Sequence, residues 1–173
     1  SSDLLALDAK ATRTAGLTDA SGRDVEEVVD LSLDKIPEGG QIHTNLDLRK
    51  GSDGTYRMKV RFTSTGTLIL NLSKVVGTAE TSLLVKTLST PTYGPGDKIR
   101  LDFQVTGDGT TSSLKAKVWK VGDTEPGSWT ATTTDSESTL QDAGYVGFVG
   151  YAQAITNGPV TVSLYNLKVS KVS

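Results

Sequence analysis

Few residues of this chain have the chemistry of a catalytic centre. His43 is the only histidine, so a Ser-His-Asp triad or a histidine-bound metal ion would have to use it. Glycoside hydrolysis needs two carboxylates across a cleft, and the nearest grouping is Glu26, Glu27 and Asp30. That grouping precedes the first clear strand pattern, so we interpret it as solvated surface charge. The sequence therefore favours a protein without catalytic activity.

The residues around His43 leave one enzymatic alternative open. Gln41-Ile42-His43 matches a short motif of the alginate lyases, which have a jelly-roll fold. That family also needs an Arg-rich strand motif and a Tyr-containing strand motif, and the sequence contains neither. We therefore interpret His43 as an exposed polar residue that alternates with Ile42. The alternative is a polysaccharide lyase or hydrolase in which His43 acts with Tyr or Arg partners.

Aromatic residues are the strongest indication of a binding function. The apolar face of a sugar ring stacks on Trp or Tyr, so glycan-binding surfaces present these residues outward. Trp119 lies on the polar side of an alternating run, Trp129 follows a turn at 123–127, and Tyr145 and Tyr151 flank a glycine-containing strand pattern. We take these four residues as candidate glycan contacts. The structural alternative is that the tryptophans pack on each other across a hairpin and that the tyrosines support the core.

The motifs demand no cofactor, but the loops leave room for a structural calcium ion. Cysteine is absent, which excludes disulfides and thiolate metal sites. Because Asp and Asn also favour turns, no calcium ligand can be assigned from them and any metal site stays unknown. The oxygen-bearing residues in question are Asp47, Asp53, Asp97, Asp108, Asp123, Asp142 and Asn157.

The alternation of apolar and polar residues predicts the strands that must hold these side chains. Runs with a period of two residues cover 29–34, 42–49, 56–62 and 99–105. Turn residues separate the runs at short spacing, which indicates antiparallel pairing. We therefore predict an all-β fold in which two antiparallel sheets form a β-sandwich.

Other segments depart from this pattern. Residues 68–75 and 81–88 are more continuously apolar, and we expect them to be central strands covered on both faces. A change of parity at Tyr165-Asn166 predicts a β-bulge. Near the N-terminus the pattern is weaker: residues 3–11 are compatible with a short helix or a strand, and residues 20–24 have the composition of a loop.

Length and composition indicate one soluble domain. The chain has 173 residues, and we expect a single domain over 1–173, with a less certain segment at 1–28 and the sandwich core at 29–173. Lys plus Arg number 18 and Asp plus Glu 20, and this net charge of −2 argues against nucleic-acid binding. The absence of an apolar run long enough to cross a bilayer argues against membrane insertion. The chain opens at Ser1, so we expect a processed fragment of an extracellular, cell-surface or virion protein.

Several segments together resemble a known group of proteins. The resemblance is to repeats in large surface proteins of actinobacteria and their phages, and these repeats are similar to the concanavalin A-like, laminin-G-like superfamily. It implies a jelly-roll sandwich over about residues 25–170. Relatives often carry an Asp-Asp pair near the last strand, a candidate calcium site, where this chain has Tyr165-Asn166. The matching segments, in the same order, are 32–40, 56–62, 74–81, 93–97, 114–119, 125–129 and 144–147.

The resemblance implies a non-catalytic module. Such modules occur as carbohydrate-binding domains beside hydrolases, as adhesin stalks and in phage tails, and a fold alone does not select among these roles. We expect a glycan-binding or adhesive module whose partner is a polysaccharide or a cell-surface glycan. The alternatives are the lyase or hydrolase above and a structural or assembly domain of a phage tail or bacterial adhesin, with protein partners or as a homo-oligomer.

Overall fold

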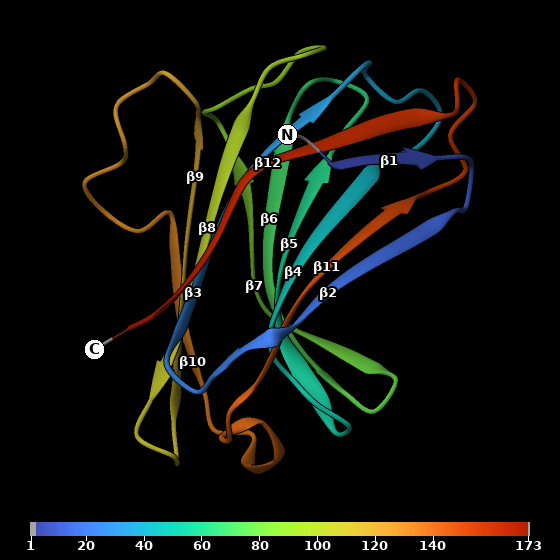
Figure 1. The fold of residues 1–173 in the computed structure, drawn as a ribbon. Helices are drawn as coiled ribbons and strands as arrows, with labels where there is room; N and C mark the ends of the chain where they lie inside the picture. The colour runs from blue at the N-terminus through green and yellow to red at the C-terminus, as the bar shows by residue number, and fades with distance from the viewer. Residues whose placement is uncertain (1–2, 173) are drawn as a thin grey trace.

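The computed structural model describes residues 3–172, which form two antiparallel β-sheets packed face to face (Figure 1). The predicted all-β, two-sheet jelly-roll sandwich is confirmed. Sheet A contains, in spatial order, β1 (Asp3–Leu7), β12 (Val160–Lys171), β3 (Val25–Leu33), β8 (Ile99–Gly107), β9 (Ser112–Lys120) and β10 (Ala131–Asp135). Sheet B contains β2 (Thr12–Gly22), β11 (Gly144–Ala152), β4 (Ile42–Lys50), β5 (Gly54–Phe62), β6 (Leu68–Val76) and β7 (Ala79–Leu88), and a 3-10 turn, η1 (Ser138–Leu140), precedes β11.

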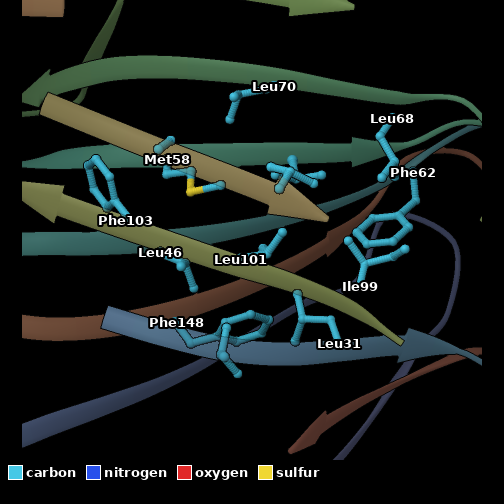
Figure 2. Close-up of a cluster of buried hydrophobic side chains, with 14 of the residues drawn as sticks. Leu31, Leu46, Met58, Phe62, Leu68, Leu70, Ile99, Leu101, Phe103 and Phe148 are labelled. Atoms are coloured by element: carbon cyan, nitrogen blue, oxygen red, sulfur yellow. The ribbon is translucent and has the colours of Figure 1, made fainter. Parts of the chain in front are cut away.

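The core lies between the sheets because each strand turns its apolar residues to one side. Figure 2 shows Met58 and Phe62 of β5 in this layer together with Leu101 and Phe103 of β8, and all four are buried. The residues that alternate with them, such as Lys59, point away from the core and are only partly buried. Most polar side chains therefore lie on the outer faces of the sheets and at the ends of the sandwich. Glu27 of β3 is an exception: it is buried on the core side, so its interpretation as solvated surface charge was wrong.

The two continuously apolar segments are not covered on both faces. Strand β6 lies inside sheet B, but its residues alternate between buried and half-buried over Leu68–Asn71. Strand β7 is the outermost strand of the sheet, and Val85 is 55% exposed. The prediction of a central strand is therefore confirmed for β6 and wrong for β7, and the prediction of cover on both faces is wrong for both strands. Apolar residues at a sheet edge resemble those of a central strand in sequence.

The N-terminal residues belong to the sheets. Of the two alternatives for the first segment, the structure has a strand, β1, which pairs with β12. The loop predicted at 20–24 is wrong for its first residues, because Ser21 and Gly22 pair with Tyr145 and Gly144 in the ladder between β2 and β11. Pairing with a distant strand overrides the local preference of Ser and Gly for turns.

The predicted bulge near the C-terminus is confirmed. The register of β12 against β3 shifts between Tyr165 and Lys168, and Asn166 adopts a left-handed backbone angle, φ 53°. The Asn166 amide donates a hydrogen bond of 2.8 Å to Asp30 of β3. An asparagine suits this position because its short polar side chain tolerates a positive φ.

One buried arginine ties the two sheets together at one end of the sandwich. Arg49 of β4 has φ 52° and lies where the pairing of β4 with β11 shifts register, so its side chain turns inward rather than outward. Its Nε donates to the Arg23 carbonyl (2.6 Å), and its Nη1 donates to Ser112 Oγ of β9 (2.7 Å) and to the Leu140 carbonyl of η1 (3.0 Å). The carboxylate of Asp24 lies 3.9 Å from Nη2. A guanidinium with only 3% exposure thus links sheet B to sheet A and to η1.

We predict that Arg49→Met lowers the free energy of unfolding by about 3–5 kcal/mol, because it removes the donor for three acceptors, two of them in buried hydrogen bonds, and the counter-charge of Asp24. Chemical denaturation measures this change. Arg13→Met on the exposed edge strand β2 is the matched control and is expected to stay within about 0.5 kcal/mol of the parent. Equal stability of the two variants would show that Arg49 does not hold the sheets together.

Candidate functional site

The outer surface of sheet B is built from the residues that alternate with its core residues. Antiparallel pairing sets them in rows across the sheet: His43 is the register partner of both Tyr151 and Arg61, and Asn45 is the partner of Lys59. These side chains leave the sheet on the side away from the core. We call the following residues the polar face: Tyr151 of β11; His43, Asn45 and Asp47 of β4; Arg57, Lys59 and Arg61 of β5; and Asn71 and Ser73 of β6.

One half of the polar face is a closed network of ion pairs. Arg57 donates to both oxygens of the buried Asp47, at 2.6 and 2.8 Å, and its other terminal nitrogen lies 3.3 Å from Glu80 of β7. Lys59 Nζ (2.7 Å) and Ser73 Oγ (2.8 Å) also contact Glu80. Burial alone would raise the pKa of Glu80, but the hydrogen bonds from Lys59 and Ser73 outweigh it and lower that pKa. The carboxylates in this half are therefore paired with cations of the protein and are not free for a ligand.

The other half of the polar face has polar atoms without partners. The side chain of Asn45 is almost wholly buried, with 5% exposure, yet its Oδ1 accepts no hydrogen bond from any described residue. Three further buried atoms lack a partner among the described residues: His43 Nε2, the donor Arg61 Nε and, one residue before β4, Gln41 Oε1. A buried polar atom that lacks a partner costs about 1–3 kcal/mol. These atoms include both hydrogen-bond acceptors and donors.

His43 is a neutral imidazole in contact with a tyrosine ring. Burial, together with the positive charges of Lys59 and Arg61, lowers the pKa of His43 to about 4. The ring of Tyr151 meets it edge-on, with the ring centroids 5.5 Å apart and the planes at 78°. The expectation that His43 is an exposed polar residue was wrong: it is half-buried because β11 places Tyr151 beside it.

A pocket extends the polar face beyond this row. It has a volume of about 360 Å³ and is lined by Tyr145, Lys50 and the edge-strand residues Thr14 and Gly16, among others. The Tyr145 side chain is 49% exposed and so is available to stack on a ligand. Tyr145 and Tyr151 both belong to β11, which therefore carries an aromatic residue at each end of the surface.

The tryptophans lie on the opposite side of the molecule, on the outer face of sheet A. Trp119 of β9 is only 8% exposed, and the Arg100 guanidinium lies 5.8 Å from the centre of its ring. Trp129 is half-buried, and the ammonium groups of Lys117 and Lys115 lie 5.0 and 5.8 Å from its ring centre. Each indole thus meets a cation, whereas the ring–ring contacts of residues 3–172 involve neither of them.

The four aromatic residues selected from the sequence therefore cannot form one site. Trp119 belongs to sheet A and Trp129 lies in the following loop against Lys117 of the same sheet, while Tyr145 and Tyr151 belong to sheet B. Trp119 forms part of a cleft of about 390 Å³ between residues 86–91 and 118–130, where it contributes to the floor rather than an open platform.

Sequence reasoning missed the residues with unpartnered atoms. Asn45 and Arg61 sit at outward positions of clearly alternating strands, and that alternation was the available signal. Which of them lack partners depends on neighbours from other strands. Within residues 3–172, no three His, Asp or Glu side chains come together as a metal-binding group, and no helix is long and apolar enough to cross a membrane.

Comparisons with solved structures show the same sandwich in a carbohydrate-binding module, a lectin-like domain and a module of a phage protein. A carbohydrate-binding module, CBM66 from Bacillus subtilis, is 14% identical with a TM-score of 0.58, and the match covers 95% of this chain and 84% of that one. A legume lectin-like domain from Entamoeba histolytica is 9% identical with a TM-score of 0.57, covering 99% and 90%. The CBM2 module of the evolved Dit protein of Lactobacillus casei BL23 phage J-1 is 9% identical with a TM-score of 0.52, covering 88% and 67%.

An enzyme also contains this fold as one part. Xylan β-1,4-xylosidase from Bacillus halodurans C-125 is 13% identical with a TM-score of 0.57, but the match covers 87% of this chain and only 28% of the enzyme. No family description and no curated protein matches the sequence. At these identities the comparisons establish the fold alone.

We predict that Trp119→Ala lowers the free energy of unfolding by about 3–5 kcal/mol, because truncation of a buried indole removes packing that the cleft cannot recover. Chemical denaturation measures the loss, and Trp129→Ala, at a half-buried site, is expected to lose less. A Trp119→Ala variant that is as stable as the parent but loses sugar binding would instead make Trp119 a ligand platform.

Proposed function

We propose that this chain is a non-catalytic glycan-binding module of an extracellular or surface protein, and that the polar face of sheet B is its binding site. The observation that carries the proposal is the group of unpartnered atoms on Gln41, His43, Asn45 and Arg61. Sugar hydroxyl groups both donate and accept hydrogen bonds, so one saccharide can supply the donor that Asn45 Oδ1 lacks and the acceptor that Arg61 lacks. Protein-bound sugars also need an aromatic surface, and Tyr151 stands beside His43.

The fold supports this proposal by analogy. The sandwiches of similar shape include a carbohydrate-binding module, a lectin-like domain and a module of a phage protein. They are consistent with the cell-surface or virion setting that the sequence resemblance implies. A purely structural role in an adhesin or phage tail would instead use protein contacts or self-association, and it gives no reason for the unpartnered atoms on an outer face.

We predict that Asn45→Ala weakens glycan binding by roughly 5- to 150-fold without lowering stability. The change removes one hydrogen bond to the ligand, worth about 1–3 kcal/mol when its partner stays buried, and it also removes an unsatisfied buried atom from the free protein. A glycan array identifies the ligand, and calorimetry with and without a calcium chelator measures the affinity.

Gln104→Ala is the matched control, since Gln104 is a half-buried amide on the outer face of sheet A that already donates to Glu26. It is expected to leave binding unchanged. Equal loss of affinity in both variants would place the site elsewhere. Light scattering decides the structural alternative: a stable oligomer that binds no glycan would contradict the proposed function.

The contact between His43 and Tyr151 favours a second candidate, a polysaccharide lyase. In such a reaction His43 would take the proton next to a uronate carboxylate, the bond to the leaving sugar would break, and the Tyr151 hydroxyl would protonate the departing oxygen. Arg61, the register partner of His43, lies where the uronate carboxylate would need neutralising. A pKa of about 4, however, makes His43 a weak base at neutral pH, so binding without turnover is the better supported function.

We predict that the protein releases no unsaturated sugar ends from a panel of polyuronides, because the base is too weak to remove the proton. The ultraviolet absorbance of the unsaturated product measures turnover. Turnover that disappears in His43→Ala and Tyr151→Phe, but persists in the control Tyr145→Phe, would reverse the conclusion and identify a lyase.

A further inference from the structure

We propose that the polar face recognises an anionic saccharide, and that Arg61 binds its carboxylate or sulfate group. This inference rests on the proposed function and specifies the chemical class of the ligand. It rests on the distribution of charge over sheet B: the carboxylates described on this side of the sheet already pair with other cations, and none of them pairs with Arg61.

The cations on this side of sheet B outnumber the carboxylates. Asp47 pairs with Arg57 at 2.6 Å and lies 3.8 Å from Lys50. Glu80 pairs with Arg57 at 3.3 Å and with Lys59 at 2.7 Å. Two carboxylates are thus shared by three cations, which leaves one positive charge in excess before Arg61 is counted.

Arg61 adds a second excess charge and has no counter-ion. Its register partners are His43 on β4 and Ile69 on β6, so neither neighbouring strand offers a carboxylate directly opposite. Among residues 3–172 it makes neither an ion pair nor a side-chain hydrogen bond, and its Nε is buried. A guanidinium cannot lose its charge at physiological pH, so the shortage can be met only by an acceptor from outside.

The shape of the guanidinium indicates the group it would take. Its planar fork of N–H donors matches the two oxygens of a carboxylate or the oxygens of a sulfate. Partial burial beside His43 and Ile69 strengthens such a contact relative to one in bulk water. The positive charge also acts on His43: the charges of Lys59 and Arg61 help to lower the pKa of this residue.

The neighbours of Arg61 point to a sugar acid rather than to a nucleic acid. One free guanidinium lies among groups that suit hydroxyls, namely the Asn45 amide, the neutral His43 and the Tyr151 ring. The whole chain has a net charge of −2, which disfavours a densely charged polyanion. A saccharide with occasional anionic groups and many hydroxyls fits both facts.

The test compares ligands that differ only in charge. Calorimetry measures binding of oligogalacturonate against its methyl ester, and of a sulfated galactan against the desulfated chain. We expect the charged member of at least one pair to bind tenfold or more tightly, and the pair that shows the difference tells carboxylate from sulfate. Arg61→Gln should remove this preference and leave binding of the neutral member unchanged, whereas Arg13→Gln, which removes the same charge from exposed edge strand β2, should keep it.

The outcomes separate the two proposals. Equal binding of charged and neutral members, or a preference that survives Arg61→Gln, overturns the anionic ligand and leaves glycan binding intact. Failure to bind any glycan overturns the proposed function and this inference with it.

A second experiment measures the pKa of His43 instead of an affinity. His43 is the only histidine, so its ring resonance can be followed by NMR without assignment of the chain. The groups that face it are Lys59, Arg61, Glu80 and Tyr151, and its pKa in the free protein is about 4. A sulfated ligand that stays charged at this pH should raise that pKa, and so should Arg61→Gln in the free protein. An unchanged pKa in both experiments would show that Arg61 neither acts on His43 nor holds an anion beside it.

Discussion

Successive side chains of a β-strand point to opposite faces of the sheet, and the arrangement of this protein depends on that constraint. In β4, Ile42, Thr44 and Leu46 must face the core if His43 and Asn45 are to face outward. Thr44 is a polar residue on the core side of β4 and is fully buried. Its hydroxyl donates a hydrogen bond of 3.3 Å to the Val60 carbonyl, which offsets the cost of burying it. A slip of one residue would bury the polar face and expose the core, so the packing between the sheets also positions the binding residues.

Stability and binding are separated along the length of β4 and β5. At one end the Asp47–Arg57 pair has two short hydrogen bonds and reaches Glu80 on the edge strand, which fastens β7 to the rest of the sheet. At the other end His43 and Arg61 face each other, and no described residue provides a counter-ion for Arg61. The paired end holds the backbone of both strands in place, so the unpaired end keeps its geometry without needing internal partners. Binding sites commonly contain such locally unfavourable groups, held by the surrounding structure.

Sequence reasoning could predict on which face of a sheet a residue lies, but not which residues of other strands lie beside it. The alternation over 42–49 and 56–62 predicted which residues of β4 and β5 point outward, and the structure agrees except at Arg49, which turns inward where β4 shifts register against β11. It did not predict that Tyr151 lies beside His43, because that contact depends on β11 entering sheet B next to β4. The same limit explains the aromatic candidates: sheet membership is decided by distant pairing, which sent Trp119 and Tyr151 to opposite faces. The local sequence of β7 likewise does not indicate that this strand lies at the edge of its sheet.

Buried polar atoms without a hydrogen-bond partner also occur outside the polar face, and one of them is Nη2 of Arg49, which lies 3.9 Å from the Asp24 carboxylate. Glu27 in the interior and Asp102 on the outer face of sheet A also have a buried oxygen without a partner. Burial raises the pKa of Asp102 to about 7 and that of Glu27 well above its ordinary value, so each can reduce the cost of its burial by taking up a proton. The amide of Asn45 and the guanidinium of Arg61 have no such option near neutral pH, because neither changes its charge there. Hydrogen-bond partners for these two groups would come from molecules outside the protein. Water can supply such partners at an open surface, but it does not distinguish one ligand from another. A saccharide presents several hydrogen-bonding groups in fixed positions on one ring. An amide, an imidazole and a guanidinium that are also held in fixed positions can therefore distinguish one saccharide from another.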